Sequence, residues 1–314
     1  MAINFSSLGN QIQNGNLLIV DGLNVAFRWK HSKQLEYKHD YVRTVESLAK
    51  SYDCGNIVVL ADGGSTYRKN LSPDYKANRS EKYAEQTAQE KAEFAQFMGE
   101  FKNAFSQLEK RGHLTIRQDG LEADDLAAWI VGKKAEFGID QIWMVSSDRD
   151  WDLLIQDGVS RFSTVTRKEI TLDNWDDHYD VEPSMYLTQK CLAGDTGDNV
   201  PGIAGIGPKR AISLIEQYGD LFDIYNACPI DSKYKFIQSL NENADRLLLN
   251  AELMDLVSYS EQAIIEADMN LEDLSSDYLN IINDFIFYID DETDSYKGVK
   301  LELERFDLKT INID

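Results

Sequence analysis

The chain contains 314 residues with a formal net charge of −22, and 43% of its residues are hydrophobic. This composition is typical of a globular protein with one large or two moderate domains, and no apolar stretch is long enough to predict a membrane span. The three cysteines and four histidines are scattered, without the spacing of a disulfide framework, a zinc site or a catalytic triad. Any chemistry must therefore rest on carboxylates. The N-terminal residues lack a secretory signal pattern, so we expect a cytoplasmic protein.

Short apolar segments recur in the first half of the chain, and each ends in an acidic residue, glycine or serine. Segments of helical length and spacing separate them, for example 39–52 and 123–138. This alternation predicts an α/β fold with a mostly parallel central sheet and helices on both faces. In such sheets, ligands bind beyond the carboxyl ends of the strands. The expected strands lie at 16–22, 56–64, 113–120 and 141–150.

Residues 65–112 interrupt the alternation with a polar, basic stretch and then a helical pattern. Apolar residues recur at helical spacing in the second part, which favours a helix packed on the core. The basic part is either a solvated loop or a binding surface. The apolar positions of the helical pattern are Phe94, Phe97, Met98, Phe101, Phe105 and Leu108.

Beyond residue 182 the strand pattern ends and helices with short turns are predicted, which divides the chain into 1–182 and 183–314. A glycine-rich turn, GIAGIGPKR, follows the paired acids of GDTGD in this second region. Such a turn before a helix is either structural or a contact for phosphate. The last part of the chain, 263–314, is strongly acidic, which favours a solvated tail.

The carboxylates at the predicted strand ends carry the functional prediction. Brought into one pocket they would repel one another, so a cation must compensate, and oxygen ligands favour hard divalent ions such as Mg²⁺. Taken singly, an aspartate here is equally explained as a helix cap or turn former. Several acidic strand ends in one sheet favour a metal site. The residues are Asp21, Asp62, Glu122, Asp124, Asp125, Asp148, Asp150, Asp195 and Asp198.

These motifs, in this order, resemble the structure-specific 5′-nuclease or flap endonuclease family, most closely its bacteriophage 5′-exonuclease branch. The segments that carry the resemblance are LLIVDGLN, LADGGSTYR, PDYKANRSEKYA, EADDLAAWIV, SSDRDWD, VSRFSTVTRKE and GDTGDNVPGIAGIGPKRA. The resemblance implies a nuclease core with an inserted helical arch at 65–112 and a helix-hairpin-helix element. It implies two-metal hydrolysis of DNA near the 5′ ends of flaps or nicks in replication, leaving 5′-phosphate and 3′-hydroxyl.

The resemblance also assigns residues. The first metal site would comprise Asp21, Asp62, Glu122, Asp124 and Asp125, and the second Asp148, Asp150, Asp195 and Asp198. Two Mg²⁺ ions are implied, with Mn²⁺ as a substitute, and Asp124 is placed to serve both sites. The residues implied in catalysis are Lys76, Asp124, Asp148 and Asp150.

Contacts to DNA are implied in two regions. The arch region would supply Arg68, Tyr75 as a stacking residue, Lys76, Arg79 and Lys82. The glycine-rich turn would supply Gly205, Gly207, Lys209 and Arg210, with K⁺ held by its carbonyl oxygens. The local basic patches would then direct DNA to one track on an acidic protein.

We expect a monomer that acts on DNA with 5′ flaps, nicks or free ends, and on RNA/DNA hybrids, without a membrane partner. A phage origin would place it in the cytoplasm of the bacterial host. One alternative is a non-catalytic binder of DNA junctions, but none of the expected carboxylates is missing. Another is a related endoribonuclease of the PIN type, against which the arch and GIAGIGPKR argue.

Overall fold

The computed structural model describes residues 15–270. At its centre lies a sheet with the strand order β3-β2-β1-β4-β5-β6, in which all neighbours run parallel except the last pair. The strands are β1 (Leu17–Asp21), β2 (Asn56–Ala61), β3 (Leu114–Arg117), β4 (Ile142–Val145), β5 (Val159–Phe162) and β6 (Glu169–Ile170). The predicted mostly parallel sheet is confirmed, and β1 to β4 lie within the four predicted segments. The strand β5 was missed because the buried polar residues Ser160 and Arg161 interrupt its apolar pattern.

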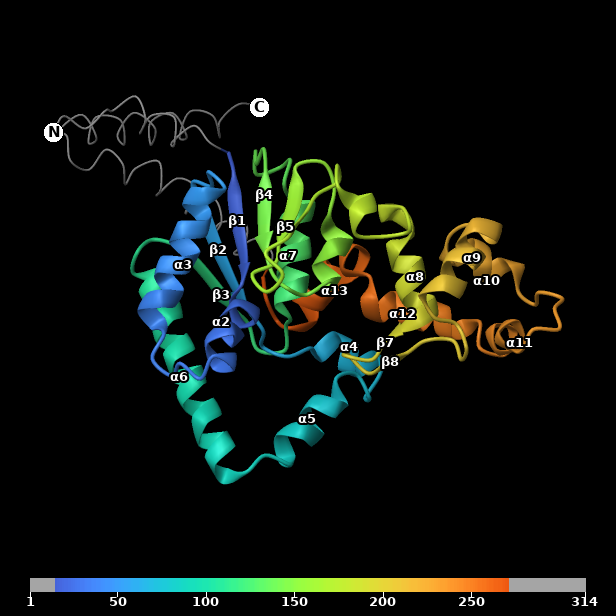
Figure 1. The fold of residues 1–314 in the computed structure, drawn as a ribbon, viewed down its shortest axis with the longest axis horizontal. Helices are drawn as coiled ribbons and strands as arrows, with labels where there is room; N and C mark the ends of the chain where they lie inside the picture. Colours follow the sequence, from blue (N-terminus) through green and yellow to red (C-terminus); the bar gives the residue numbers. More distant parts are fainter. Residues whose placement is uncertain (1–14, 271–314) are drawn as a thin grey trace.

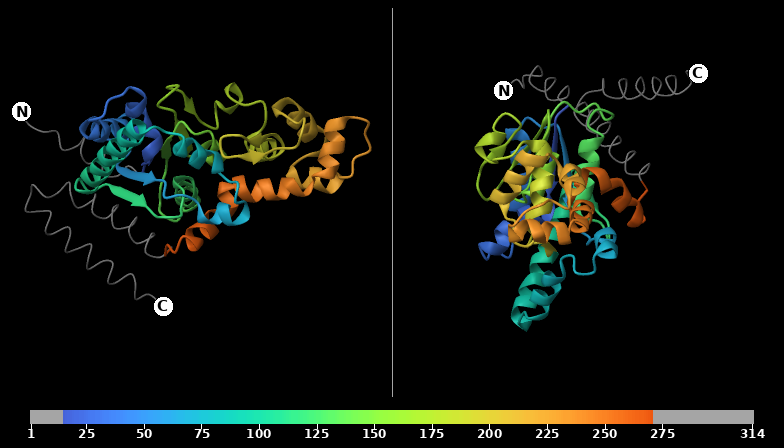
Figure 2. Two further views of the ribbon diagram at one scale, coloured as in Figure 1. Left: turned by 90° about the horizontal axis from the view of Figure 1, so that it is seen from below. Right: turned by 90° about the vertical axis from the view of Figure 1, so that its right-hand side faces the viewer.

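Helices cover both faces of the sheet (Figures 1 and 2). One face is covered by α2 (Gly22–His31), α3 (Lys38–Ser51) and α6 (Ala88–Glu109). The other is covered by α7 (Ala123–Gly132), the short 3₁₀ helix η1 (Asp150–Leu154) and α13 (Leu256–Glu266). Within residues 15–270, no helix is both long and apolar enough to cross a lipid bilayer.

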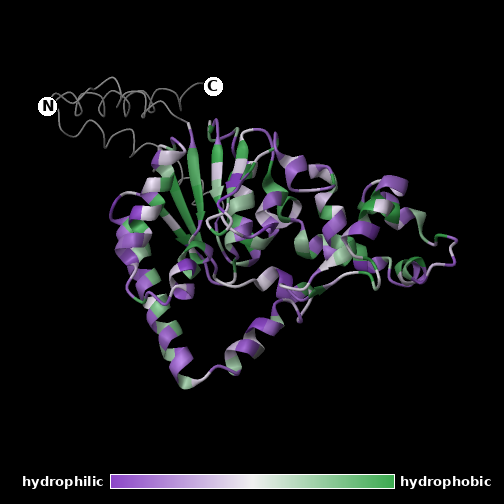
Figure 3. Ribbon diagram, viewed as in Figure 1, coloured by the Kyte–Doolittle hydropathy of each residue, from purple (hydrophilic) through white to green (hydrophobic). Residues whose placement is uncertain are grey.

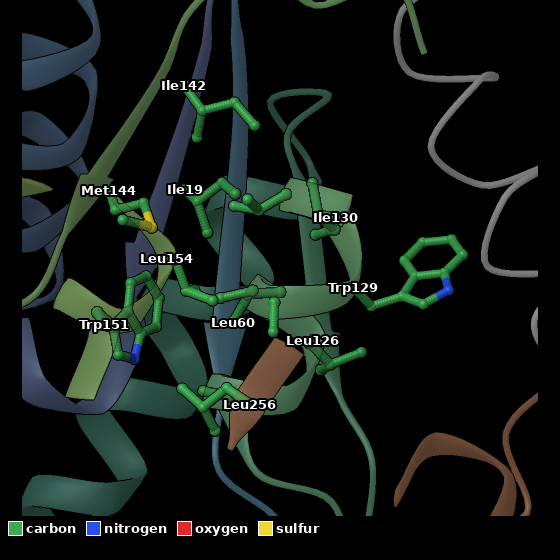
Figure 4. Close-up of a cluster of buried hydrophobic side chains, with 14 of the residues drawn as sticks. Ile19, Leu60, Leu126, Trp129, Ile130, Ile142, Met144, Trp151, Leu154 and Leu256 are labelled. Carbon is green, nitrogen blue, oxygen red and sulfur yellow. The ribbon is translucent and has the colours of Figure 1, made fainter. Parts of the chain in front are cut away.

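Alternate residues of the strands fill two separate cores because successive side chains point to opposite faces of a sheet. In β1, Leu17 and Ile19 join the core beneath α7 and α13, while Leu18 and Val20 join the core beneath α2, α3 and α6. The central strands are mostly apolar in Figure 3, and Figure 4 shows Ile19 beside side chains of β2, β4 and α7. The sheet is therefore a rigid platform whose carboxyl edge positions the residues that follow each strand.

The segment between β2 and β3 forms α4 (Thr66–Leu71), α5 (Ala77–Ala84) and α6. The apolar positions Phe97, Phe101 and Leu108 of α6 are buried, as the helical pattern predicted. The helix α5 and the first turns of α6 project from the body and meet at an apex (Figure 1). The first part of the predicted arch region does not project, because α4 packs on the body through the buried Tyr67 and Arg68, and the projecting part begins after α4 (Figure 1).

The region beyond residue 182 is mainly helical, with a third core between its helices. It includes η3 (Pro183–Met185), α8 (Tyr186–Ala193), α9 (Pro208–Tyr218), α10 (Leu221–Ala227), α11 (Lys235–Glu242) and α12 (Asp245–Met254), and it follows the short η2 (Trp175–Asp177). The prediction that strands stop at 182 needs one correction, since β7 (Gly194–Asp195) and β8 (Val200–Pro201) pair as a small antiparallel hairpin. The helix α13 returns to the main sheet and packs on α7. Most of the predicted acidic tail lies outside the described residues.

Leu60→Ala should lower the free energy of unfolding by about 2 to 5 kcal/mol, because it leaves a cavity beneath α7 at the centre of the sheet (Figure 4). Leu172→Ala is the matched control, since Leu172 is 46% exposed. Its change should stay within about 0.5 kcal/mol. Equilibrium unfolding in urea measures both values, and equal losses would be inconsistent with this core.

Candidate active site

The predicted carboxylates of three adjacent strands meet at the carboxyl edge of the sheet. Asp21 is the last residue of β1, Asp62 follows β2, and Asp148 lies three residues beyond β4. Because β2, β1 and β4 are parallel neighbours, their ends converge. Burial, with the nearby charge of Asp62, raises the pKa of Asp21 to about 8. The edge is therefore a place where negative charge is costly unless a cation is near.

Hydrogen bonds fix these carboxylates. Asp21 caps α2 by accepting from the backbone N–H of Asn24 at 3.2 Å, and its other oxygen accepts from Ser146 Oγ at 2.7 Å. Asp62 accepts from the N–H of Ala123 at 2.9 Å, which ties the end of β2 to the start of α7. The capping interpretation is thus correct for Asp21, but capping uses one of its two oxygens.

The start of α7 brings Glu122, Asp124 and Asp125 to the same edge. Asp124 accepts from the indole Nε1 of Trp151 at 2.6 Å, so a buried aromatic side chain fixes one of its oxygens. Burial, with the nearby charge of Asp148, raises the pKa of Asp124 well above its ordinary value. Asp62 also raises this pKa, so Asp124 lies close enough to both of these acids to feel their charges.

Arg68 lies behind these acids and is 1% exposed. Its guanidinium donates to Glu122 at 2.9 Å and to both oxygens of Asp125 at 2.8 and 2.7 Å, and its Nε donates to the carbonyl of Leu253 at 2.8 Å. The prediction that Arg68 contacts DNA is therefore wrong, because the side chain is interior. Both oxygens of the buried Asp125 accept from the same guanidinium, so Arg68 holds this predicted metal ligand from behind.

Tyr75 also lies in the interior, with 4% exposure. Its hydroxyl lies 3.3 Å from both oxygens of Glu122 and 3.1 Å from Asp198 Oδ2. The prediction that Tyr75 stacks on a base is therefore corrected, because its ring has no exposed face. Tyr75 instead links the acids of α7 to those of the β7–β8 hairpin.

Lys76 stands at the front of the site. Its Nζ contacts Glu122 Oε1 and lies 3.3 Å from Asp198 Oδ2. Burial alone would lower the pKa of Lys76, but the charge of Glu122 outweighs it and keeps the amine protonated. The amine lies beside an open cavity of about 460 Å³, which Asp62, Glu122, Lys76 and Arg79 help to line. A phosphate in this cavity would meet a fixed positive charge.

A second lysine, Lys190 in α8, was not predicted. Its Nζ contacts Asp150 and lies 3.2 Å from Asp195 Oδ2. Burial raises the pKa of Asp150, Lys190 lowers it, and the net result is about 6. The sequence signal was weak: a single lysine five residues before Asp195, within a short helix. Lys190 is nevertheless the counterpart of Lys76 on the other side of the site.

The hairpin of β7 and β8 positions the last two predicted ligands. Asp195 Oδ1 accepts from the N–H groups of Gly197 and Asp198 at 2.8 and 3.2 Å. Asp198 forms an ion pair with Arg79 at 2.7 Å, and its carbonyl accepts from the N–H of Lys76 at 2.9 Å. The base of the arch and the hairpin are therefore joined directly.

The remaining predicted DNA contacts lie apart from the carboxylates. Lys82 is exposed on α5, and Lys209 is exposed in the first turn of α9. Gly205 has φ +81°, which favours glycine, and its carbonyl accepts from Arg210. The Arg210 guanidinium also lies 4.7 Å from the centre of the Phe236 ring. Arg210 thus supports the turn, while Lys209 points its charge to solvent.

The side chains at this edge fit hard divalent cations, since every candidate ligand is a carboxylate. Among residues 15–270, however, no group of three or more acidic, histidine or cysteine side chains is already close enough together to hold a metal ion. Four cationic side chains instead offset the acids. Arg68 does so from behind, Lys76 and Lys190 from the front, and Arg79 at the rim.

Comparison with known proteins defines the class. A family model described as the 5′-3′ exonuclease N-terminal resolvase-like domain matches residues 16–180. A second, the 5′-3′ exonuclease C-terminal SAM fold, matches 181–277. The chain belongs to the 5′-3′ exonuclease family, and the predicted nuclease resemblance is confirmed.

Individual proteins and solved structures similar to this chain narrow the comparison further. The chain is 42% identical to the flap endonuclease of Escherichia phage T5 over 270 residues, which cover 85% of this chain and 92% of that protein. A structure of T5 5′-exonuclease with bound divalent zinc ions is 40% identical, with a TM-score of 0.77, covering 87% of this chain and 98% of that one. A T5 flap endonuclease complex with DNA and metal ions is 39% identical, with a TM-score of 0.76, covering 87% and 97%.

Arg68→Met should destabilise the protein by about 3 to 5 kcal/mol, because it leaves Glu122 and Asp125 buried without their cation. Arg79→Met is the control, since Arg79 is mostly exposed and its pair should contribute about 1 kcal/mol or less. Denaturant unfolding of both variants gives the comparison. A small loss for Arg68→Met would rule out its role as the buried counter-charge.

Proposed function

We propose that the chain binds two divalent cations, Mg²⁺ with Mn²⁺ as a substitute, and hydrolyses DNA near the 5′ ends of flaps and nicks. The observation that carries this proposal is the gathering of acids from β1, β2, β4, α7 and the β7–β8 hairpin at one edge, beside a lysine-lined cavity. The metal ions and DNA named for the T5 structures support it. The first ion would be held by Asp21, Asp62, Glu122, Asp124 and Asp125, and the second by Asp148, Asp150, Asp195 and Asp198.

When bound, the ions would polarise the phosphoryl oxygens and lower the pKa of the attacking water. Two side chains of the protein would have further roles. Lys76 places a protonated amine at the scissile phosphate, where negative charge grows in the transition state. Trp151 holds Asp124 in one orientation through its indole N–H, so this acid cannot rotate away. The products would carry 5′-phosphate and 3′-hydroxyl groups.

The DNA track would start at the arch and end at the glycine-rich turn. Lys82 and Arg79 would line the path of the single strand, and Lys209 with the amides of Gly205 and Gly207 would contact the duplex backbone. A K⁺ ion at this turn belongs to the proposal, although Arg210 already donates to the Gly205 carbonyl. We propose that the protein acts as a monomer in the cytoplasm during replication, on RNA/DNA hybrids as well as DNA.

Asp148→Asn should abolish turnover yet leave DNA binding nearly intact, because it removes a cation ligand and no phosphate contact. Wild-type activity should vanish with a chelator and return with Mg²⁺ or Mn²⁺. A 5′-labelled flap substrate measures cleavage, and fluorescence anisotropy in Ca²⁺ measures binding. Full cleavage by Asp148→Asn would remove this residue from the mechanism.

Lys76→Ala should slow single-turnover cleavage by about a hundred- to a thousandfold, since one charge donor to the transition state is lost. Its Kd for DNA in Ca²⁺ should change much less. Lys82→Ala is the matched control, because Lys82 is exposed away from the acids and should affect mainly the Kd. A normal rate for Lys76→Ala at saturating DNA would reduce Lys76 to a general groove charge.

Lys209→Ala should weaken duplex binding on all sequences alike and lower the slope of log K against log salt by about one unit. Arg210→Ala should lower it less, because this side chain is directed to the Gly205 carbonyl and the Phe236 ring. Binding isotherms over a series of KCl concentrations give both slopes. An unchanged slope for Lys209→Ala would argue against a phosphate contact.

A further inference from the structure

A second buried arginine lies beneath the other half of the site. Arg161, in β5, is 3% exposed. Its Nε and Nη2 donate to the two oxygens of Asp152 at 2.5 and 2.7 Å. Tyr179 also donates its hydroxyl to Asp152. Because Arg161 is buried, it cannot contact DNA, and the proposed chemistry gives it no role.

The third donor of Arg161 reaches a different part of the chain. Its Nη1 donates to the carbonyl of Ser146, just beyond β4, at 2.8 Å. The hydroxyl of Ser146 in turn donates to Asp21 at 2.7 Å and lies 3.1 Å from the N–H of Asp148. One guanidinium therefore holds both ends of residues 146–152, and Asp148 and Asp150 lie between these ends.

We propose that Arg161 is a positioning residue that sets the orientation of Asp148 and Asp150 and thereby the affinity of the second cation. The inference rests on the proposed function, which assigns these two acids to that cation. A guanidinium suits the task because its rigid planar fork makes three directed bonds, whereas a lysine amine is a single mobile charge. Groups that hold metal ligands in place typically contribute about ten- to a hundredfold in metal affinity.

The competing explanation is that the Arg161–Asp152 pair only stabilises the fold. Removing one partner of a buried ion pair is strongly destabilising, while replacing both by neutral groups is often tolerated. The double variant Arg161→Met with Asp152→Asn therefore separates the two roles. It removes both charges and keeps an oxygen acceptor for Tyr179, but the Ser146 carbonyl loses its donor. A matched control is Arg111→Met with Glu46→Gln, a half-exposed pair on the opposite side of the sheet.

The experiment counts Mn²⁺ bound to each full-length variant by electron paramagnetic resonance of free Mn²⁺, alongside thermal unfolding without metal. We expect two ions on the wild type and the control. The double variant should remain folded and bind one of its two ions about ten- to a hundredfold more weakly. Its single-turnover cleavage should need correspondingly more Mg²⁺ and recover at high Mg²⁺. Asp148→Asn identifies which ion is the second.

A folded double variant with the wild-type Mn²⁺ isotherm and Mg²⁺ midpoint would overturn the positioning role. If the double variant does not fold, Arg161→Lys is tested instead, because it keeps the positive charge but loses the planar guanidinium fork. Weaker Mn²⁺ binding by this variant would support the positioning role, and wild-type Mn²⁺ binding would overturn it. If neither folds, Arg161 is structural and the inference fails. A wild type that binds no Mn²⁺ would instead count against the proposed function itself.

Discussion

Buried negative charge at the carboxyl edge of the sheet is the constraint around which this structure is arranged. The carboxyl ends of parallel strands lie at the same edge of the sheet, so the acids that follow these strands lie close together. Burial raises the pKa of Asp21, Asp62 and Asp124, which shows how unfavourable their charged forms are without a compensating cation. The chain supplies two kinds of compensation. Guanidinium groups, permanently charged and rigid, lie behind the acids, and flexible lysine amines lie in front.

The arginines and the lysines have different roles at this edge. Arg68 and Arg161 each bind an acid through two parallel hydrogen bonds and also bind a backbone carbonyl, so they fix the positions of chain segments. Lys76 and Lys190 each contact two acids through one amine: Lys76 contacts Glu122 and Asp198, and Lys190 contacts Asp150 and Asp195. The arginines thus fix chain segments from inside the protein, and the lysines link acids of different segments beside the open edge.

The sheet and its acidic edge could be predicted because local patterns determine them: apolar strands, glycine or acid at their ends, and helices between. Arg68 could not be placed from sequence, since an arginine among tyrosines in a polar run is equally typical of an exposed groove. Its burial depends on Glu122, Asp125 and the carbonyl of Leu253, all distant in sequence. Asp152 is likewise indistinguishable from Asp150 in the run DRDWD until β5 brings Arg161 beneath it. Lys190 was missed for the same reason, because only the hairpin turn brings Asp195 back beside it.

The return of α13 to the main sheet means that a late segment of the chain completes a core begun by its first half. Leu256, Ala263 and Ile264 complete the core beneath α7, and α7 carries Glu122 and Asp124 at its first turn. A ribosome synthesises these acids long before it synthesises the helix that packs behind them. The growing chain therefore holds an incomplete site through most of translation. The core behind the site is therefore complete only once α13 has also been made, so a chain cut before Leu256 would lack part of the packing beneath the helix that carries Glu122 and Asp124.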